Sequence, residues 1–185
     1  MKIGIFGSAA GEIKPVFEKA RELGEILASE NVTIITGAST GIPYQAAYAA
    51  YKKGAAVWGY SPSMDYKSHI KDTGDDVSIY KKLIYVSRDF QYGKNILVTR
   101  KYRNVLSTAN CDAGIIISGR WGTLNEFTNL FDMGKVIGVL TGTGGVANEL
   151  KSLSKKISKP SKAKIIFDSS PRRLVKSILK ELAKS

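Results

Sequence analysis

The chain has 185 residues, of which 43% are hydrophobic and 24% charged, a size and composition typical of one globular domain. It contains one cysteine, Cys111, and one histidine, His69, which excludes an internal disulfide and argues against a zinc site built from His and Cys. A Ser-His-Asp triad would have to use His69, and no nucleophile-elbow motif accompanies that residue. No apolar run reaches the roughly 20 residues that span a bilayer, and the N-terminus lacks the features of a signal peptide. We therefore expect a cytoplasmic protein with no membrane partner and no metal site.

Most of the formal net charge of +12 lies near the C-terminus. Residues 151–185 contain eleven Lys and Arg but two acids, so this segment carries +9. Such a segment could bind nucleic acid. However, Phe167 is the only aromatic residue among these charges, whereas base-stacking surfaces interleave aromatics with cations. We therefore expect a solvated basic face and no specific nucleic-acid partner.

Strand-like and helix-like segments alternate along the chain. Short apolar or β-branched runs predict strands at residues 2–7, 31–36, 55–60, 83–87, 113–118, 136–141 and 163–168. Apolar residues at helical spacing predict helices from Pro15 to about Leu27 and at residues 42–53, 95–108, 123–133, 146–157 and 171–183. Residues 61–80 show no clear period, which indicates a long loop that either acts as a lid or is a partly ordered connection.

This alternation predicts an α/β fold of Rossmann-like, doubly wound type. Its sheet should be mostly parallel, with helices on both faces, and residues 1–185 should form one nucleotide-binding domain. Ligands of such sheets bind beyond the carboxyl ends of the strands. The loops that follow strands are therefore the places to look for a site.

Three of these loops consist mostly of small residues. They are residues 7–11 (Gly-Ser-Ala-Ala-Gly), residues 36–41 (Thr-Gly-Ala-Ser-Thr-Gly) and residues 118–123 (Ser-Gly-Arg-Trp-Gly-Thr). Glycine allows a ligand to approach the backbone closely, and the start of the following helix offers free N–H groups that suit phosphate. The loops match neither the dinucleotide fingerprint nor a Walker A motif, which disfavours NAD binding and ATP hydrolysis.

Two features near the third loop admit more than one interpretation. Glu126 follows Thr123 by three residues, so the pair could form a capping box at a helix start, or Glu126 could be a functional carboxylate that acts on a sugar. The preceding helix carries Arg100, Lys101 and Arg103, and the pattern does not settle which of its sides Arg100 occupies.

Together these motifs resemble the Lonely-Guy-type phosphoribohydrolases, often called lysine decarboxylase-like. The resemblance rests on Arg100-Lys101, on residues 111–113 (Cys-Asp-Ala) and on residues 118–126, which correspond to the family's Pro-Gly-Gly-x-Gly-Thr-x-x-Glu. It covers roughly residues 1–140. The chain departs from the family by having Ser118-Gly119-Arg120 in place of Pro-Gly-Gly. Related proteins include molybdenum-cofactor carriers and, more distantly, DNA-processing A proteins.

The resemblance implies cleavage of the N-glycosidic bond of a nucleoside 5′-monophosphate, giving the free base and ribose 5-phosphate. Glu126 would stabilise the oxocarbenium-like transition state or position water, and Arg100 would orient the substrate or help the base to leave. The expected substrate- and phosphate-binding residues are Gly7, Ser8, Gly37, Thr40, Gly41, Lys101, Gly119, Arg120, Trp121, Gly122 and Thr123. No cofactor is required, lysine decarboxylase activity is not expected, and an AMP-like nucleotide or phosphate could be bound.

Two other classes of function stay open at this point. The protein could carry or sense a nucleotide or a pterin cofactor without turnover, with Arg120 as a ligand clamp. It could also act on nucleic acid through its basic C-terminal segment. The resemblance further implies a homodimer with its sites near the subunit interface.

Overall fold

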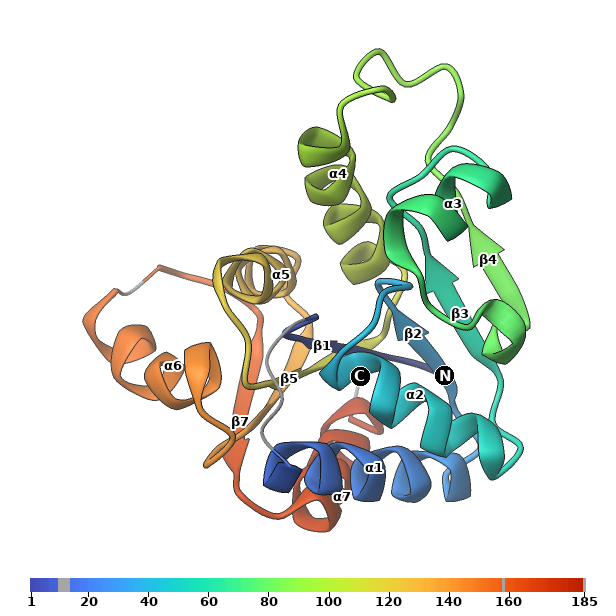
Figure 1. Ribbon diagram of the computed structural model, residues 1–185. Helices are drawn as coiled ribbons and strands as arrows, with labels where there is room; N and C mark the ends of the chain where they lie inside the picture. Colours follow the sequence, from blue (N-terminus) through green and yellow to red (C-terminus); the bar gives the residue numbers. More distant parts are fainter. Residues whose placement is uncertain (10–13, 158, 185) are drawn as a thin grey trace.

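The computed structural model describes residues 1–9, 14–157 and 159–184, and these form one parallel sheet covered by helices (Figure 1). The strands are β1 Lys2–Gly7, β2 Thr33–Thr36, β3 Val57–Tyr60, β4 Lys82–Ile84, β5 Ala113–Ile117, β6 Val136–Leu140 and β7 Lys164–Asp168. The α-helices are α1 Lys14–Ser29, α2 Ile42–Lys52, α3 Tyr66–Thr73, α4 Ile96–Ala109, α5 Trp121–Asp132, α6 Gly145–Lys156 and α7 Pro171–Leu182. A short 3₁₀ helix, η1, covers Val77–Ile79.

The strand order is β4-β3-β2-β1-β5-β6-β7, and every pairing is parallel. Strands β2, β3 and β4 follow one another outward on one side of β1, and strands β5, β6 and β7 follow one another outward on its other side. The predicted doubly wound α/β fold is thereby confirmed. The switch point lies where Gly7 of β1 pairs with Ile117 of β5, the position at which sheets of this kind bind ligands.

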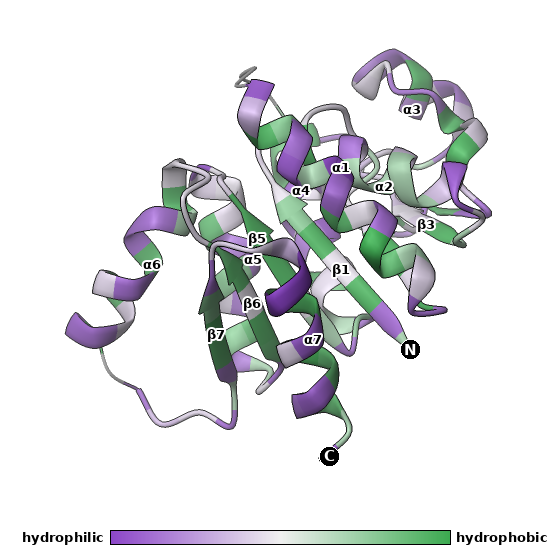
Figure 2. Ribbon diagram, turned by 90° about the horizontal axis from the view of Figure 1, so that it is seen from below, coloured by the Kyte–Doolittle hydropathy of each residue, from purple (hydrophilic) through white to green (hydrophobic). Residues whose placement is uncertain are grey.

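Alternate residues of the strands face two separate apolar cores. Ile3 and Ile5 of β1 pack in the core covered by α1, α2 and α7, whereas Phe6 packs in the core covered by α5 and α6. Figure 2 shows this burial: the central strands are mostly hydrophobic, whereas the helices carry both hydrophobic and hydrophilic residues. The two-sided burial explains why the central strands are continuous apolar runs in the sequence.

The main difference from the sequence prediction lies in residues 61–80, which fold into α3 and η1 instead of a long loop. A reciprocal capping box between Asp65 and Ser68 begins α3, and Gly74 in the left-handed conformation ends it. Its one buried residue is His69. The helix therefore lacks the apolar stripe that reveals a helix in a sequence, because a buried polar side chain anchors it instead.

Candidate functional site

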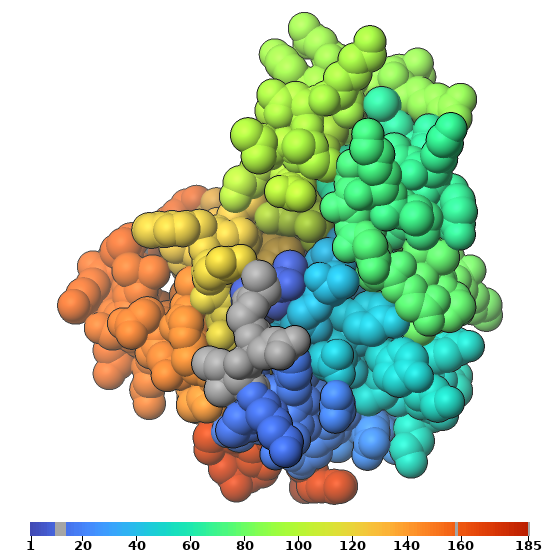
Figure 3. All heavy atoms as spheres, viewed as in Figure 1, coloured from blue at the N-terminus to red at the C-terminus, as the bar shows by residue number. Residues whose placement is uncertain are grey.

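A cavity of about 520 Å³ opens at the carboxyl ends of β1, β2 and β5. Ten of the thirteen predicted site residues line it: Gly7, Ser8, Gly37, Thr40, Arg100, Lys101, Arg120, Gly122, Thr123 and Glu126. Figure 3 shows the end of β1, the 37–41 loop, α4 and the start of α5 converging in the middle of one face. Three loops from distant parts of the sequence thus meet at one place. Ala10 and Gly11 of the first loop lie outside the described residues.

The other three predicted residues lie beside the cavity. Gly41 and Gly119 have φ angles of +90° and +99°, and each packs against a neighbouring segment. A Cβ at Gly41 would lie 2.4 Å from the backbone oxygen of Ser8, and one at Gly119 would meet Thr123. These glycines therefore shape the loops. Trp121 is 81% exposed and lines a separate apolar groove between α5 and α6.

Two non-glycine residues of these loops also have positive φ angles. Ala38 has a φ of 44° and Ser118 a φ of 51°. The backbone N–H of Ala38 donates to Thr36 Oγ1 at 3.2 Å, and that of Ser118 donates to Thr143 Oγ1 at 2.9 Å. Hydrogen bonds that the backbone donates to buried threonines thus hold a conformation that is costly for residues other than glycine, as often occurs at binding sites.

Helix α5 begins at the cavity with no side-chain cap. Its N-cap residue is Arg120, whose side chain makes no capping hydrogen bond, and its first residue is Trp121. The capping-box interpretation of Thr123 and Glu126 is therefore wrong, because Thr123 already lies inside the first turn. The sequence pattern missed this start because Gly122 reads as a loop residue. The first N–H groups of α5 consequently stay available at the cavity, beside Gly122 and Thr123.

Glu126 pairs with Arg103, a residue that was not among the predicted site residues. The distance from Arg103 Nη1 to Glu126 Oε1 is 3.8 Å, and the two side chains are 13% and 8% exposed. Arg100 is exposed at the rim of the cavity. The guanidinium of Arg103 also covers Gly37, where a Cβ would lie 1.5 Å from Nη1. The arginine that contacts the carboxylate thus lies three residues beyond Arg100, for which the resemblance implies a role toward the substrate.

The sequence pattern of α4 does not separate Arg103 from Arg100. Thr99, Arg103 and Ser107 follow one another at intervals of four residues, and Thr99 and Ser107 are fully buried in α4. Four-residue spacing places all three on one face of a helix. Arg100, Asn104 and Thr108 repeat this spacing, and Asn104 and Thr108 are buried too, so the pattern does not show which arginine faces inward.

Burial controls the ionisation of this pair. Burial raises the pKa of Glu126 to about 7, although Arg103 and Lys101 favour the charged carboxylate. Burial likewise lowers the pKa of the Arg103 guanidinium, against the attraction of Glu126. A carboxyl group with a pKa near neutrality can hold or release a proton at physiological pH, which is the property expected of a general acid or base.

The ionisation of Glu126 predicts that Glu126→Gln stabilises the protein at high pH. The folded-state pKa of about 7 lies above the ordinary value of 4.5, so burying the charge costs stability increasingly as pH rises from 4.5 to 7. We expect the variant to be more stable than the wild type at pH 8, by on the order of 2–3 kcal/mol, and equally stable at pH 4. Urea unfolding at pH 4, 6 and 8 measures this, with exposed Glu25→Gln as the control. A stability difference that does not change with pH would contradict the assignment.

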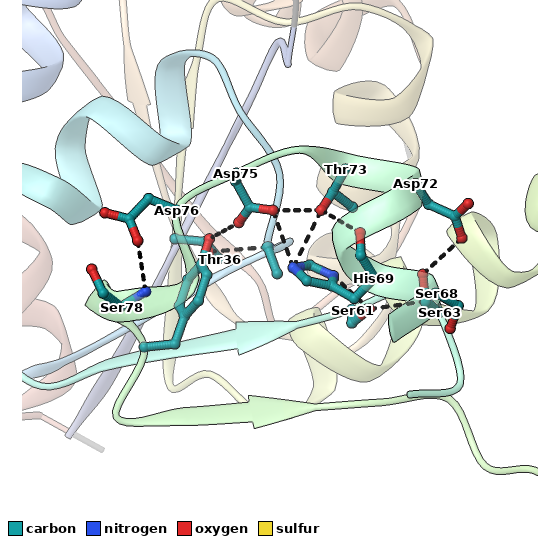
Figure 4. Close-up of polar contacts among 12 residues, drawn as sticks. Thr36, Ser61, Ser63, Ser68, His69, Asp72, Thr73, Asp75, Asp76 and Ser78 are labelled. Atoms are coloured by element: carbon teal, nitrogen blue, oxygen red, sulfur yellow. Dashed lines mark hydrogen bonds and ion pairs between the residues drawn. The ribbon is translucent and has the colours of Figure 1, made fainter. Parts of the chain in front are cut away.

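A second buried polar cluster surrounds His69 (Figure 4). The Nδ1 atom of His69 lies 2.9 Å from Ser61 Oγ, and its Nε2 atom lies 3.1 Å from Asp75 Oδ1. Thr73 donates to Asp75 Oδ1 and Tyr80 donates to Oδ2 at 2.7 Å. The chain therefore does bring a serine, a histidine and an aspartate together. Ser61 is only 1% exposed and does not line the cavity, so the trio holds structure and is not a nucleophilic triad.

This His69 cluster connects α3 to the cavity. Asp72 and Thr73, at the end of α3, line the cavity wall. On the other side, Tyr80 hydrogen-bonds to Thr36, the last residue of β2 before Gly37. The cluster therefore joins the wall formed by α3 to the loop over which Arg103 lies.

Asp75 is the charged centre of the cluster. Burial alone would raise the pKa of its carboxyl group, but hydrogen bonds from His69, Thr73 and Tyr80 lower that pKa to about 2. Since the folded-state pKa lies below the ordinary value of 3.8, the ionised group stabilises the fold fully above about pH 4. This contribution is lost as pH falls toward 2.

We therefore expect Asp75→Asn to destabilise the protein by about 2 kcal/mol at pH 7. The difference from wild type should shrink between pH 4 and pH 2, because the wild-type carboxyl group becomes protonated there. Chemical unfolding across pH 2–7 measures both effects, and exposed Asp89→Asn serves as the matched control. Equal losses in Asp75→Asn and Asp89→Asn would show that the buried hydrogen bonds do not matter.

Other candidate chemistries find little support in the described part of the chain. Burial raises the pKa of the Cys111 thiol to about 12, so this cysteine is no nucleophile. Across residues 1–9, 14–157 and 159–184, no three His, Cys, Asp or Glu side chains gather closely enough to hold a metal ion. Within the same residues, no helix is both long enough and apolar enough to cross a membrane.

The fold and the cavity define a class: Rossmann-like α/β proteins whose glycine loops and helix starts surround a ligand cavity at the topological switch point. The chain belongs to the SLOG cluster4 family, whose sequence model matches residues 1–175. This membership and the structural neighbours confirm the relationship suspected from the motifs. A comparison with curated proteins found no match.

Solved structures share the fold at low sequence identity. The protein TM1055 superposes with a TM-score of 0.78 at 18% identity, covering 97% of this chain and 98% of that one. The molybdenum cofactor carrier protein of Chlamydomonas reinhardtii has a TM-score of 0.68 at 16% identity, covering 100% and 99% of the two chains. At these identities, the similarity establishes the fold and leaves the ligand of this chain open.

A third neighbour corrects the expectation that nucleic acid is excluded as a partner. DNA processing protein A from Helicobacter pylori, described as binding single-stranded DNA, has a TM-score of 0.69 at 22% identity. The alignment covers 98% of this chain and 81% of that one. The exclusion rested on the small number of aromatics in residues 151–185. It was wrong because a fold of this kind is shared with a protein that binds single-stranded DNA, so the composition of one segment does not rule nucleic acid out.

Proposed function

We propose that this protein binds a phosphorylated, nucleotide-like small molecule in the cavity at the switch point and acts as its carrier or sensor. The main observation behind the proposal is that glycine loops, a helix start without a side-chain cap and a group of cations surround one cavity. The lining cations are Arg100, Lys101, Arg103 and Arg120, against two carboxylates, Asp72 and Glu126. Free N–H groups, the helix dipole and an excess of positive charge all favour a phosphate group.

The names of the neighbours support the carrier part of the proposal. A molybdenum cofactor carrier and a molybdenum cofactor binding protein, the latter from Rippkaea orientalis, share the fold over nearly their whole lengths. Arg120 stands where the resemblance places a glycine, at the N-cap of α5 and on the cavity wall. There its guanidinium can clamp an anionic ligand with paired hydrogen bonds.

The phosphate cradle predicts that Gly122→Ala loses ligand affinity without losing stability. A Cβ at Gly122 meets nothing within 4 Å in the protein itself, and alanine favours a helix over glycine by up to ~1 kcal/mol. The added methyl group would, however, crowd a ligand held against the start of α5. We expect calorimetric titration with nucleoside monophosphates to show affinity reduced tenfold or more, with an unchanged or higher melting temperature.

The controls for this experiment separate phosphate binding from other contacts. Exposed Thr128→Ala, farther along α5, should leave affinity unchanged. The corresponding nucleosides, which lack phosphate, should bind the wild type more weakly than the monophosphates do. Nucleosides that bind as tightly as monophosphates would refute the cradle.

A second candidate function, hydrolysis of the N-glycosidic bond, is favoured by the Glu126–Arg103 pair. Water would add to C1′ of the ribose while the bond to the base breaks, and the base would leave with a proton. As a carboxylate, Glu126 could stabilise the positive charge that develops on the ribose or accept the proton of the attacking water. Arg103 would hold Glu126 in place and favour its charged form.

If hydrolysis occurs, its rate should rise with pH through about 7, because the carboxylate form of Glu126 is the active one. Glu126→Gln should lower the rate a hundredfold or more and abolish this rise. Chromatography of the free base released from AMP, GMP, CMP and UMP measures it. A wild type that binds these nucleotides but releases no base removes the hydrolase candidate and leaves the carrier proposal standing.

A further inference from the structure

A second hollow adjoins the cavity at the start of α4. Its volume is about 1050 Å³, and it lies between the segment that leads into α4 and the turn that precedes α3. Leu97, in the first turn of α4, lines both this hollow and the main cavity. The two spaces therefore adjoin across one side chain, and a single ligand could reach past it into both.

The chemistry of this second hollow differs from that of the cavity. Two cations, Arg88 and Lys94, are balanced there by two carboxylates, Asp65 and Asp89. The rest of its lining includes apolar and aromatic side chains, namely Met64, Phe90, Tyr92, Ile96 and Leu97. A space with balanced charges and aromatic walls suits a neutral ring, whereas the cavity with its excess of cations suits an anion.

The aromatic wall is already in place without a ligand. Phe90 stacks on Tyr102 of α4 with ring centroids 4.3 Å apart and an interplanar angle of 14°, and Tyr92 meets the edge of Phe90. Gly93 fits closely against Met64, because a Cβ at Gly93 would lie 2.6 Å from the Met64 sulfur. Yet Tyr92 and Leu97 stay 53% and 69% exposed. Contacts within the protein thus hold these side chains in place, and their exposed surface remains open to a ligand.

Helix α4 links the two spaces along one face. Leu97, Lys101 and Asn104 recur at helical spacing and all line the cavity. Asn104 lies against the third glycine loop, with its side-chain amide 3.4 Å from the backbone oxygen of Gly122. Asn104 and Leu97 are seven positions apart in the helix, which corresponds to a rise of about 10 Å. A nucleoside monophosphate has a similar extent from phosphate to base.

We propose that this second hollow is the subsite for the heteroaromatic ring of the ligand. The phosphate lies at the glycine loops, the sugar or linker follows α4 past Lys101, and the ring packs against Leu97 and Tyr92. This inference rests on the proposed binding of a phosphorylated ligand and adds which end of that ligand goes where. It makes the site specific for molecules that join a phosphate to a ring.

The test compares a ligand that has the ring with one that lacks it. Nucleoside monophosphates and ribose 5-phosphate are titrated calorimetrically into wild type, Tyr92→Ala, Leu97→Ser and Tyr66→Ala. Tyr66 is 57% exposed on α3 and lines neither space, so it is the matched control. We expect Tyr92→Ala and Leu97→Ser to weaken nucleotide binding about tenfold, the scale of losing one ring contact. Their affinity for ribose 5-phosphate should equal that of the wild type.

The outcomes separate this inference from the proposed function. If the wild type binds nucleotides and ribose 5-phosphate equally well, the ring has no subsite, although phosphate binding stands. If Tyr92→Ala and Leu97→Ser weaken both ligands alike or neither, the ring lies elsewhere. If the wild type binds no phosphorylated ligand at all, the proposed function fails and the inference falls with it. An oligothymidylate could also bind the wild type more tightly than the mononucleotides do. If Tyr92→Ala removes that difference in affinity, the hollow binds a strand of several bases, and the assignment of a single ring is wrong.

Discussion

The buried contact between Glu126 and Arg103 is the constraint on which the site depends. Neither charge is well solvated, and their separation of 3.8 Å is too long for a hydrogen bond. Such a pair is expensive, because removing two ions from water costs more than a loose contact returns. The fold accepts this cost at the bottom of its main cavity and at the crossing of α4, α5 and the β2 loop. A carboxylate retained there at a cost in stability points to a use other than holding the fold together.

The neighbouring backbone is organised around the same pair. The guanidinium of Arg103 occupies the space in which a side chain at position 37 would lie, so glycine at this position leaves room for the buried cation. Gly119 in turn packs against Thr123, the residue one helical turn before Glu126. The glycines of the site thus serve two purposes. Gly122 leaves open space beside the cavity, and others leave room for the protein's own buried groups.

The fold could be predicted from the sequence because its strands are buried on both faces. Continuous apolar runs such as residues 113–117, which are all buried, give a strong signal, and their alternation with amphipathic helices fixes a parallel sheet. Residues 66–73 gave no such signal because α3 is anchored by one histidine and its hydrogen bonds. Periodicity reports apolar burial, and it does not detect a helix that buries a polar side chain.

The location of the cavity was also predictable from the sequence. Which of its side chains contact one another was only partly predictable. Loops after β1, β2 and β5 must meet at one edge of the sheet, so ten predicted residues line one cavity. Which arginine faces Glu126 depends on the rotation of α4, and a shift of one turn replaces Arg100 with Arg103. The helix start at Trp121 was missed for a similar reason, since a glycine in the first turn has no sequence signal that distinguishes it from a loop residue.

The two buried carboxylates of the protein show how environment separates a structural role from a functional one. Asp75 accepts hydrogen bonds from Thr73 and Tyr80 and contacts His69, and its pKa falls to about 2. Glu126 is as deeply buried but faces its cation across 3.8 Å, and its pKa rises to about 7. Desolvation raises the pKa of both groups and acts more strongly on Glu126, whereas hydrogen bonds outweigh it at Asp75. A carboxylate that the protein has already supplied with donors completes the fold, whereas one whose cation lies beyond hydrogen-bond distance on a cavity wall is suited to accept hydrogen bonds from a ligand.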